Sequence, residues 1–207
     1  MKLIYHFLFI LLFISFTSCS KDVVNKSVIK DKSLDAQVLE AYKDGLASLN
    51  GGDVLFAAKK FNEAEILFPQ SIWAPKSALM AAYSYYSKDY YLDAIAELER
   101  FLRIYSTHKN LDYVYYLIGI WYYENIVDEK KDNQSILLAK ENFEKVIKEF
   151  SNTEYALDSE FKINLINDIL ASKEMYIGRY YLDKKKWISA INRFRKVVDE
   201  YDTTIYF

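Results

Sequence analysis

The sequence predicts an all-α fold, an α-solenoid built from about four stacked helical hairpins. Glycine and proline, the residues that most often interrupt helices, number only five and two among 207 residues. Hydrophobic residues make up 52% of the chain, which is enough for one domain with a sizeable core. The third observation is an internal repeat, because an alanine recurs in the same context in four segments.

The repeat is seen when these four alanines are aligned: Ala57, Ala94, Ala139 and Ala190. Residues suited to a core recur at offsets of −3, +4, +7 and +11 from each alanine. The +4 column holds Phe61, Leu98, Phe143 and Phe194. These offsets follow one face of a helix with 3.6 residues per turn. Each segment is therefore predicted to be the second helix of a hairpin, in which the small alanine lets a neighbouring helix approach closely.

The first helices are predicted over residues 36–49, 74–87, 111–126 and 155–182. The four hairpins then cover residues 36–70, 74–107, 111–152 and 155–203, within a domain of residues 35–207. The pattern resembles the tetratricopeptide repeat, although the alanines are 37, 45 and 51 residues apart instead of about 34. The additional residues fall in the polar segment 128–135 and in the first helix of the fourth hairpin, which is predicted to be unusually long. A generic helical bundle with coincidental alanine spacing is the alternative.

The N-terminus predicts a lipid anchor. Lys2 precedes a largely apolar run over residues 3–16, which is too short to span a bilayer as a stable helix. Small residues followed by Cys19 resemble the lipobox of bacterial lipoproteins. Residues 1–18 are then a lipoprotein signal peptide and residues 19–34 a lipidated flexible tether, with diacylglycerol and an N-terminal acyl chain on Cys19. The alternative is an ordinary secretory signal that happens to contain a cysteine.

Charge and residue content argue against several classes of protein. The formal net charge is −2, so no basic excess exists to neutralise the phosphates of nucleic acid. The two histidines are His6, in the signal, and His108, in a predicted turn. One mature histidine and a lipidated Cys19 do not make a metal site, and we expect no metal and no bound cofactor.

An enzyme is the weakest interpretation of the sequence, and we expect no catalytic residues. A cell-wall hydrolase would need two carboxylates at a fixed separation, for which Glu124, Asp128 and Glu174 are candidates. None of them lies in a recognisable motif, and the chain has no phosphate-binding glycine loop and no nucleophile elbow. Glu174 is flanked by apolar residues and is expected to be a structural hydrogen-bonding group.

Four segments carry a closer resemblance. Residues 107–119 read Thr-His-Lys-Asn-Leu-Asp-Tyr-Val-Tyr-Tyr-Leu-Ile-Gly, and the others are residues 82–86, 170–174 with 180–181, and 187–194. Together they resemble the BamD family, the helical-repeat lipoproteins of the outer-membrane β-barrel assembly machine. The resemblance runs from the lipobox to about Thr204. A secretin pilot or a cell-division coordinator shares the lipobox and periodicity, but residues 110–119 and the Asn192-Arg193 pair argue against these alternatives.

The chain departs from this family in three places. It supplies four repeats where the family has five, and its last residues look like the entry into another hairpin. We therefore expect either that a fifth repeat is missing or that a partner covers the apolar end. Lys185-Lys186 stands where the family often has Arg-Gly, and the insert of the third hairpin is reduced to residues 128–134.

The resemblance implies a scaffold at the periplasmic face of the outer membrane. Its expected partners are a POTRA domain of a BamA-like assembly protein, other lipoproteins of the machine, unfolded outer-membrane β-barrel proteins and the membrane itself through the lipid. By resemblance, Arg193 pairs with a POTRA carboxylate, and Lys184 and Trp187 are assigned to the same side; a plain surface arginine is the alternative.

For the unfolded substrate, the resemblance implies a groove on the concave surface of the first two repeats. The aromatic candidates for this groove are Phe68, Trp73, Tyr83, Tyr85 and Tyr86. An extended peptide ending in an aromatic residue could dock there. The alternative for each of them is a place in the core between helices.

Overall fold

The computed structural model describes residues 32–125 and 133–206, and every regular element within them is an α-helix. The helices are α2 (Leu34–Asn50), α3 (Val54–Leu67), α4 (Trp73–Tyr86), α5 (Tyr91–Ile104), α6 (Leu111–Glu124), α7 (Gln134–Glu149), α8 (Glu154–Asp183) and α9 (Trp187–Glu200). These bounds lie close to the predicted ones, and the all-α prediction is confirmed. Three helix starts are capped by side chains, since Ser33, Asp53 and Thr153 each accept a hydrogen bond from the N–H three residues later.

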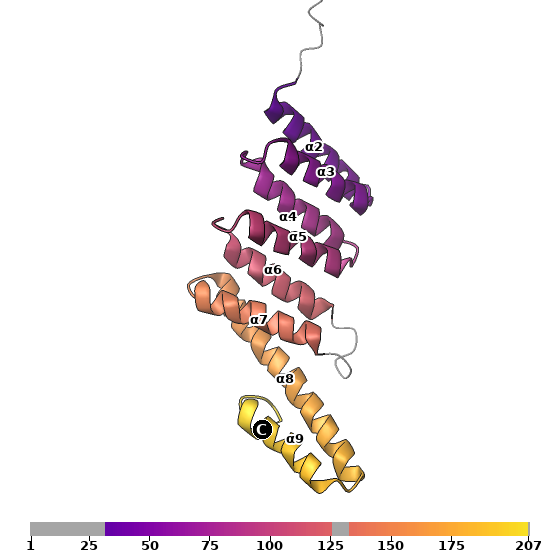
Figure 1. Ribbon diagram of the computed structural model, residues 1–207, viewed down its shortest axis with the longest axis vertical. Helices are drawn as coiled ribbons and strands as arrows, with labels where there is room; N and C mark the ends of the chain where they lie inside the picture. Colours follow the sequence, from indigo (N-terminus) through magenta and orange to yellow (C-terminus); the bar gives the residue numbers. More distant parts are fainter. Residues whose placement is uncertain (1–31, 126–132, 207) are drawn as a thin grey trace, which may run out of the picture. The chain divides into compact units, whose positions relative to one another are not determined.

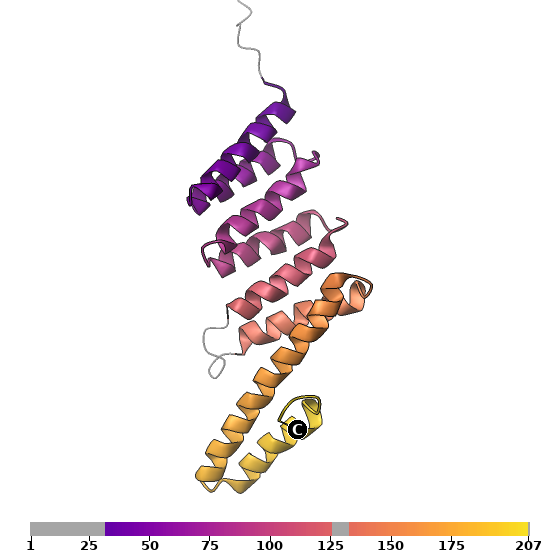
Figure 2. The ribbon, with the colours of Figure 1, turned by 180° about the vertical axis from the view of Figure 1, so that it is seen from behind.

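The helices of the unit Ser33–Phe207 stack in chain order (Figures 1 and 2). Each helix packs against the next one along the chain, and α2 also approaches α4 as α6 approaches α8. The pairs α2–α3, α4–α5, α6–α7 and α8–α9 are the four hairpins. Packing between sequence neighbours is the arrangement of a helical solenoid, as the alanine repeat predicted.

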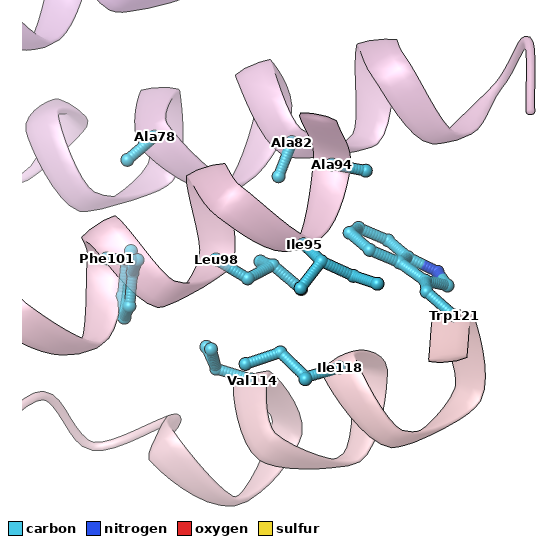
Figure 3. Packing of buried hydrophobic residues seen from close by; sticks show 9 residues of the cluster. All are labelled: Ala78, Ala82, Ala94, Ile95, Leu98, Phe101, Val114, Ile118 and Trp121. Carbon is cyan, nitrogen blue, oxygen red and sulfur yellow. The ribbon is translucent and has the colours of Figure 1, made fainter. Parts of the chain in front are cut away.

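The four aligned alanines are all buried, which is the role that their spacing predicted. Figure 3 shows the core between the second and third hairpins, where α4, α5 and α6 each contribute one layer. Ala82 and Ala94 bring α4 and α5 together, and Leu98 lies beside them with Trp121 of α6 closing the cluster. The −3 column departs from the predicted core at the last hairpin, because Trp187 is 57% exposed there.

Within three hairpins, a glycine of the first helix receives the ring of the +4 aromatic residue. The pairs are Gly45 with Phe61, Gly119 with Phe143, and Gly178 with Phe194. A Cβ atom added to Gly45 would lie 2.8 Å from Phe61 Cε1, and one added to Gly119 would lie 2.7 Å from Phe143 Cε1. The two helices therefore approach closely because one of them has no side chain at the contact.

The second hairpin reaches the same fit with different residues. Ala82 stands 16 residues before Leu98, the separation that also holds between Gly45 and Phe61. Both residues are fully buried in one cluster. Alanine is larger than the glycine of the other hairpins, and leucine is smaller than their phenylalanine. The total volume of the two side chains at the contact is therefore kept within a narrow range.

The predicted long first helix of the fourth hairpin is confirmed. Helix α8 has 30 residues, a length of about 45 Å. Its N-terminal part packs on α7, where Ile166 and Leu170, near the middle of α8, share a cluster with Ile136 and Phe143. Its second half packs on α9 and continues past the start of α7, as Figure 2 shows. The fourth hairpin is therefore displaced along α8 relative to the third.

A buried ionic network joins the second helices of the first two hairpins. Glu65 of α3 is 5% exposed. Arg100 of α5 donates to both of its carboxylate oxygens, at 3.0 and 2.6 Å, and also to Glu97 at 2.8 Å. Tyr105 donates a further hydrogen bond to Glu65 at 2.8 Å. Because an uncompensated buried charge is costly, these contacts favour one alignment of α5 on α3.

Several predictions fall outside the described residues. They are the signal peptide 1–18, Cys19, most of the tether 19–34 and the insert 128–134 except its last two residues. The boundaries of the domain and the expected fifth repeat also stay predictions.

On α9, Ile191 and Val198 form an exposed apolar flank within the described part of the chain.

The glycine contacts give a prediction of stability. Gly119→Ala should lower the free energy of unfolding by about 1–2 kcal/mol, because overpacking costs about 1–3 kcal/mol and the better helix propensity of alanine offsets up to about 1 kcal/mol. The double variant Gly119→Ala/Phe143→Leu recreates the Ala82–Leu98 pair and should recover part of the loss. Urea unfolding followed by circular dichroism measures both, and an undiminished stability of Gly119→Ala would contradict the packing account.

Candidate functional site

Arg193, the predicted partner-binding residue, lies on α9 and pairs with Glu174 of α8. Its Nη1 donates to Glu174 Oε2 at 2.9 Å, and Lys196 Nζ donates to Oε1 of the same carboxylate at 3.0 Å. Glu174 is only 7% exposed, whereas the side chains of Arg193 and Lys196 are 39% and 38% exposed. One buried carboxylate therefore holds two half-exposed cations, and Glu174 is the structural hydrogen-bonding group that the sequence predicted.

The charges in this cluster stabilise one another. Burial alone would raise the pKa of the Glu174 carboxyl, but hydrogen bonds from Arg193 and Lys196 outweigh burial and the pKa lies below its usual value. The same hydrogen bonds to Glu174 raise the pKa of Arg193 and of Lys196. All three groups are consequently ionised at neutral pH. Lys196 Nζ also lies 3.8 Å from Glu200 Oε2, so two cations face two carboxylates in this cluster.

A polar pocket of about 280 Å³ lies beside this cluster. Its walls are Tyr181, Ser189, Asn192, Arg193 and Lys196. Each of these side chains can donate a hydrogen bond, and two of them are cations. Such a set of donors suits a carboxylate, which accepts several hydrogen bonds at once.

The structure separates Lys184 and Trp187 from Arg193. Lys184 caps the C-terminus of α8, with its Nζ 5.7 Å from the centre of the Tyr180 ring. Trp187 is the first residue of α9, six positions before Arg193, so the two point about 120° apart around the helix. Neither Lys184 nor Trp187 is among the residues that line the polar pocket.

An apolar groove of about 460 Å³ lies between α4 and α6. We call it the aromatic groove, and its lining residues are Lys76, Leu79, Met80, Tyr83, Tyr86, Tyr113, Tyr116, Leu117, Ile120 and Trp121. Of the five predicted groove residues, only Tyr83 and Tyr86 line it. The groove thus lies between the first helices of the second and third hairpins.

Tyr86 and Trp121 hold one wall of the aromatic groove. Their rings stack at 4.8 Å between centres with an interplanar angle of 13°. Burial, with a hydrogen bond to Glu124, raises the pKa of Tyr86 to about 12, so the phenol stays protonated. Lys76 supplies a cation to the groove, with its Nζ 4.9 Å from the centre of the Trp73 ring. The groove can therefore accept an apolar side chain beside a negatively charged group.

Phe68, Trp73 and Tyr85 lie elsewhere. Phe68 and Trp73 pack on the core of the first hairpin, and the Trp73 ring lies 5.2 Å from that of Tyr42. Tyr85 packs against the cores of both the first and the second hairpin. It lines a separate groove with residues of α3 such as Ile66. These three residues therefore pack between helices, which was the alternative to a place in the substrate groove.

Sequence reasoning missed several lining residues. Lys196 appears in the sequence only as one more charge on α9, because the distance to Glu174 depends on how α8 and α9 pack. Tyr113, Tyr116 and Trp121 were also missed, although their spacing along α6 is that of one helix face. That spacing, together with Tyr83 and Tyr86 on the preceding first helix, was the sequence signal that could have indicated the aromatic groove.

The candidate carboxylates give the hydrolase alternative no support. Glu124 is exposed at the end of α6, and Glu174 is occupied by two cations, while Asp128 lies outside the described residues. Among residues 32–125 and 133–206, no group of three or more potential ligands is placed to hold a metal ion. Within the same ranges, the helices are too short or too polar to cross a bilayer.

Comparison with known proteins gives consistent results. Residues 34–207 match the family described as YfiO: Outer membrane lipoprotein. A similar protein of Rickettsia prowazekii (strain Madrid E), outer membrane protein assembly factor BamD, is 38% identical over 181 residues, which cover 87% of this chain and 72% of the relative.

Two further relatives carry the same name. The protein of Caulobacter vibrioides is 37% identical, with 79% of this chain and 53% of the relative covered. The protein of Neisseria gonorrhoeae is 30% identical, with 83% and 68% covered. The chain therefore spans between about half and three quarters of the length of these relatives. On these matches and on its stacked hairpins, the chain belongs to the YfiO family of outer membrane lipoproteins, together with the BamD assembly factors.

Proposed function

We propose that this chain is a lipid-anchored scaffold subunit of the outer-membrane β-barrel assembly machinery and that it has no catalytic activity of its own. The observation that carries the proposal is the similarity to assembly factors across most of the chain. The same similarity disfavours a secretin pilot or a cell-division coordinator. Stacked hairpins suit the role, because a solenoid presents an extended surface to several partners at once.

The fourth hairpin is the proposed contact with the central assembly protein. A POTRA domain of that BamA-like protein would place a carboxylate against Arg193, beside the polar pocket. An arginine suits this task because its planar fork binds a carboxylate through two parallel hydrogen bonds. Only Nη1 is used by Glu174 in the contacts described, and the side chain is 39% exposed. Lys184 and Trp187 would contact the partner outside the pocket.

The aromatic groove is the proposed contact with unfolded outer-membrane proteins. Its floor of tyrosine, leucine and tryptophan side chains suits an apolar or aromatic side chain of an extended peptide. Lys76 would attract the terminal carboxylate of such a peptide. Because Phe68, Trp73 and Tyr85 lie away from this groove, we assign substrate contact to Tyr83 and Tyr86.

Cys19 is the proposed anchor to the periplasmic face of the outer membrane. Other lipoproteins of the machine would join the same scaffold, on surfaces that we do not assign. Lipidation at a single cysteine with three acyl chains would hold the domain firmly, since one chain alone gives marginal binding.

Replacing Cys19 tests the anchor. Cys19→Ser removes the thiol that would receive diacylglycerol, so the protein should leave the membrane fraction and appear in the soluble periplasmic fraction. Metabolic labelling with palmitate should mark the wild type and not the variant. Equal labelling of both would exclude Cys19 as the lipidation site.

Reversing the charge of Arg193 tests the partner contact. Arg193→Glu should weaken binding of the POTRA domain at least about 30-fold, because a carboxylate replaces the cation that faces the partner. Copurification of the central assembly protein with the tagged chain measures the loss, and Arg193→Gln gives a milder variant that keeps a donor toward Glu174. The matched control is Arg103→Glu, at an exposed residue of α5, which should copurify with the central assembly protein as the wild type does. Unchanged binding in Arg193→Glu would refute this contact.

Truncating Tyr83 tests the aromatic groove. Tyr83→Ala should lower affinity for a C-terminal peptide of an outer-membrane β-barrel protein about tenfold, because one stacked ring contributes about 1 kcal/mol or more. Fluorescence anisotropy of the labelled peptide measures the affinity. Tyr90→Ala is the control, since Tyr90 is equally exposed, 45% against 48% for Tyr83, and does not line the groove. Equal affinities of the two variants would disprove the assignment.

A further inference from the structure

The first helices of the second and third hairpins can be compared position by position, because Ala82 and Gly119 hold the same place in their hairpins. The shift from 82 to 119 pairs Ala81 of α4 with Ile118 of α6. Ala81 packs in the core of the first hairpin, whereas Ile118 packs with α5 in the core that Figure 3 shows. This position therefore faces the second helix of the preceding hairpin.

The side chains on this face are small in α4 and large in α6. In α4 they are Ala74, Ser77, Ala81 and Ser84, all fully buried. In α6 they are Leu111, Val114, Ile118 and Trp121. Helix α8 resembles α4 where it begins on α7, because Ala156 and Ser159 are its first buried residues. The third hairpin alone among the last three thus meets the hairpin before it through bulky side chains.

These side chains keep α6 away from α5. The distance between two packed helices depends on the side chains at their contact. Fewer residues of α5 and α6 come close to each other than in any other pair of consecutive helices of the stack. The pairs α3–α4 and α7–α8, which join the other hairpins, pack more extensively. The junction between the second and third hairpins is therefore the most open one.

The spaces between successive first helices differ in the same way. Helix α2 approaches α4, and the rings of Tyr42 and Trp73 cross that space at 5.2 Å between centres. Helix α6 approaches α8, and Tyr116 donates a hydrogen bond across to Asp158 at 2.7 Å. Between α4 and α6, stacked rings cross the space at one end, and the aromatic groove of about 460 Å³ occupies it beside them.

We propose that an apolar side chain of a bound peptide completes the core at this junction and holds the second and third hairpins together. Filling the groove buries apolar surface of both α4 and α6, so the peptide favours the state in which both walls are in place. Val114 and Ile118 are positioning residues, which keep the groove wide without lining it. The proposal rests on the proposed contact with unfolded proteins and adds what binding does to the stack.

Hydrogen exchange tests whether the peptide stabilises the junction. The mature lipidated protein in detergent micelles is compared with and without a C-terminal peptide of an outer-membrane β-barrel protein, at ten times its Kd. Amides of residues 98–104 should exchange up to about tenfold more slowly, because opening of the junction must first release the peptide. These residues are informative because the groove is lined from α4 and α6 alone. Amides of α9 should not change.

Slower exchange in α4 and α6 without any change in α5 would overturn the proposal. In that case the peptide covers the walls of the groove and leaves the junction as it was.

Replacing a spacer residue tests why the groove is open. Val114→Ala recreates a small side chain like that of Ser77, so α6 should settle closer to α5 and the peptide should bind about fivefold more weakly. Val114→Ile keeps the bulk and should retain the affinity. The matched control is Val146→Ala, which removes the same two methyl groups from a fully buried residue of α7 outside the groove.

Val146→Ala should change the affinity less than about twofold, although the loss of stability is similar. Circular dichroism at the binding temperature confirms that both variants are folded. Equal affinities of Val114→Ala and Val146→Ala would show that the bulk of α6 does not set the width of the groove.

The two proposals fail in distinguishable ways. If Tyr83→Ala weakens peptide binding and the peptide leaves exchange in α5 unchanged, the completed core is wrong and the proposed groove stands. If Tyr83→Ala also leaves the affinity unchanged, the assignment of the groove itself is wrong.

Discussion

The contact between a helix position without a side chain and a large ring determines how the hairpins of this protein pack. Gly45, Gly119 and Gly178 each lie under a phenylalanine ring that leaves no room for a Cβ atom. Because the contact sets the separation of the two helices, it also sets where their outer faces lie. Ala82 with Leu98 satisfies the same constraint with the volumes exchanged. The constraint is therefore on the combined volume of the two side chains, as expected for an interior packed as densely as a crystal.

Both candidate surfaces follow from this packing. The aromatic groove exists because α4 and α6, the first helices of neighbouring hairpins, present tyrosines toward the same space. The polar pocket is formed within the fourth hairpin, by Tyr181 at the end of α8 and by residues of α9. There Arg193 and Lys196 are held by Glu174 of the same hairpin.

The sequence predicted features that depend on local periodicity and left open those that depend on packing between hairpins. Helix extents and the burial of the four alanines followed from spacing alone. The role of Glu174 followed from its apolar neighbours, but its partners did not, because they come from another helix. Trp187 occupies a core column and is nevertheless 57% exposed, which its spacing alone did not reveal. Tyr85 and Tyr86 are adjacent in sequence and face different surfaces, which a list of aromatic residues does not distinguish.

The central claim is that the polar flank of the fourth hairpin meets the POTRA domain of the assembly machinery. Photocrosslinking in living cells tests it directly, with a photoreactive residue placed at Asn192, which is exposed and lines the polar pocket. A reference site is Ile66, which is exposed on α3 at the far end of the stack. The account predicts a covalent product between the Asn192 variant and the central assembly protein, and none from the Ile66 variant. Crosslinking from Ile66 but not from Asn192 would contradict it.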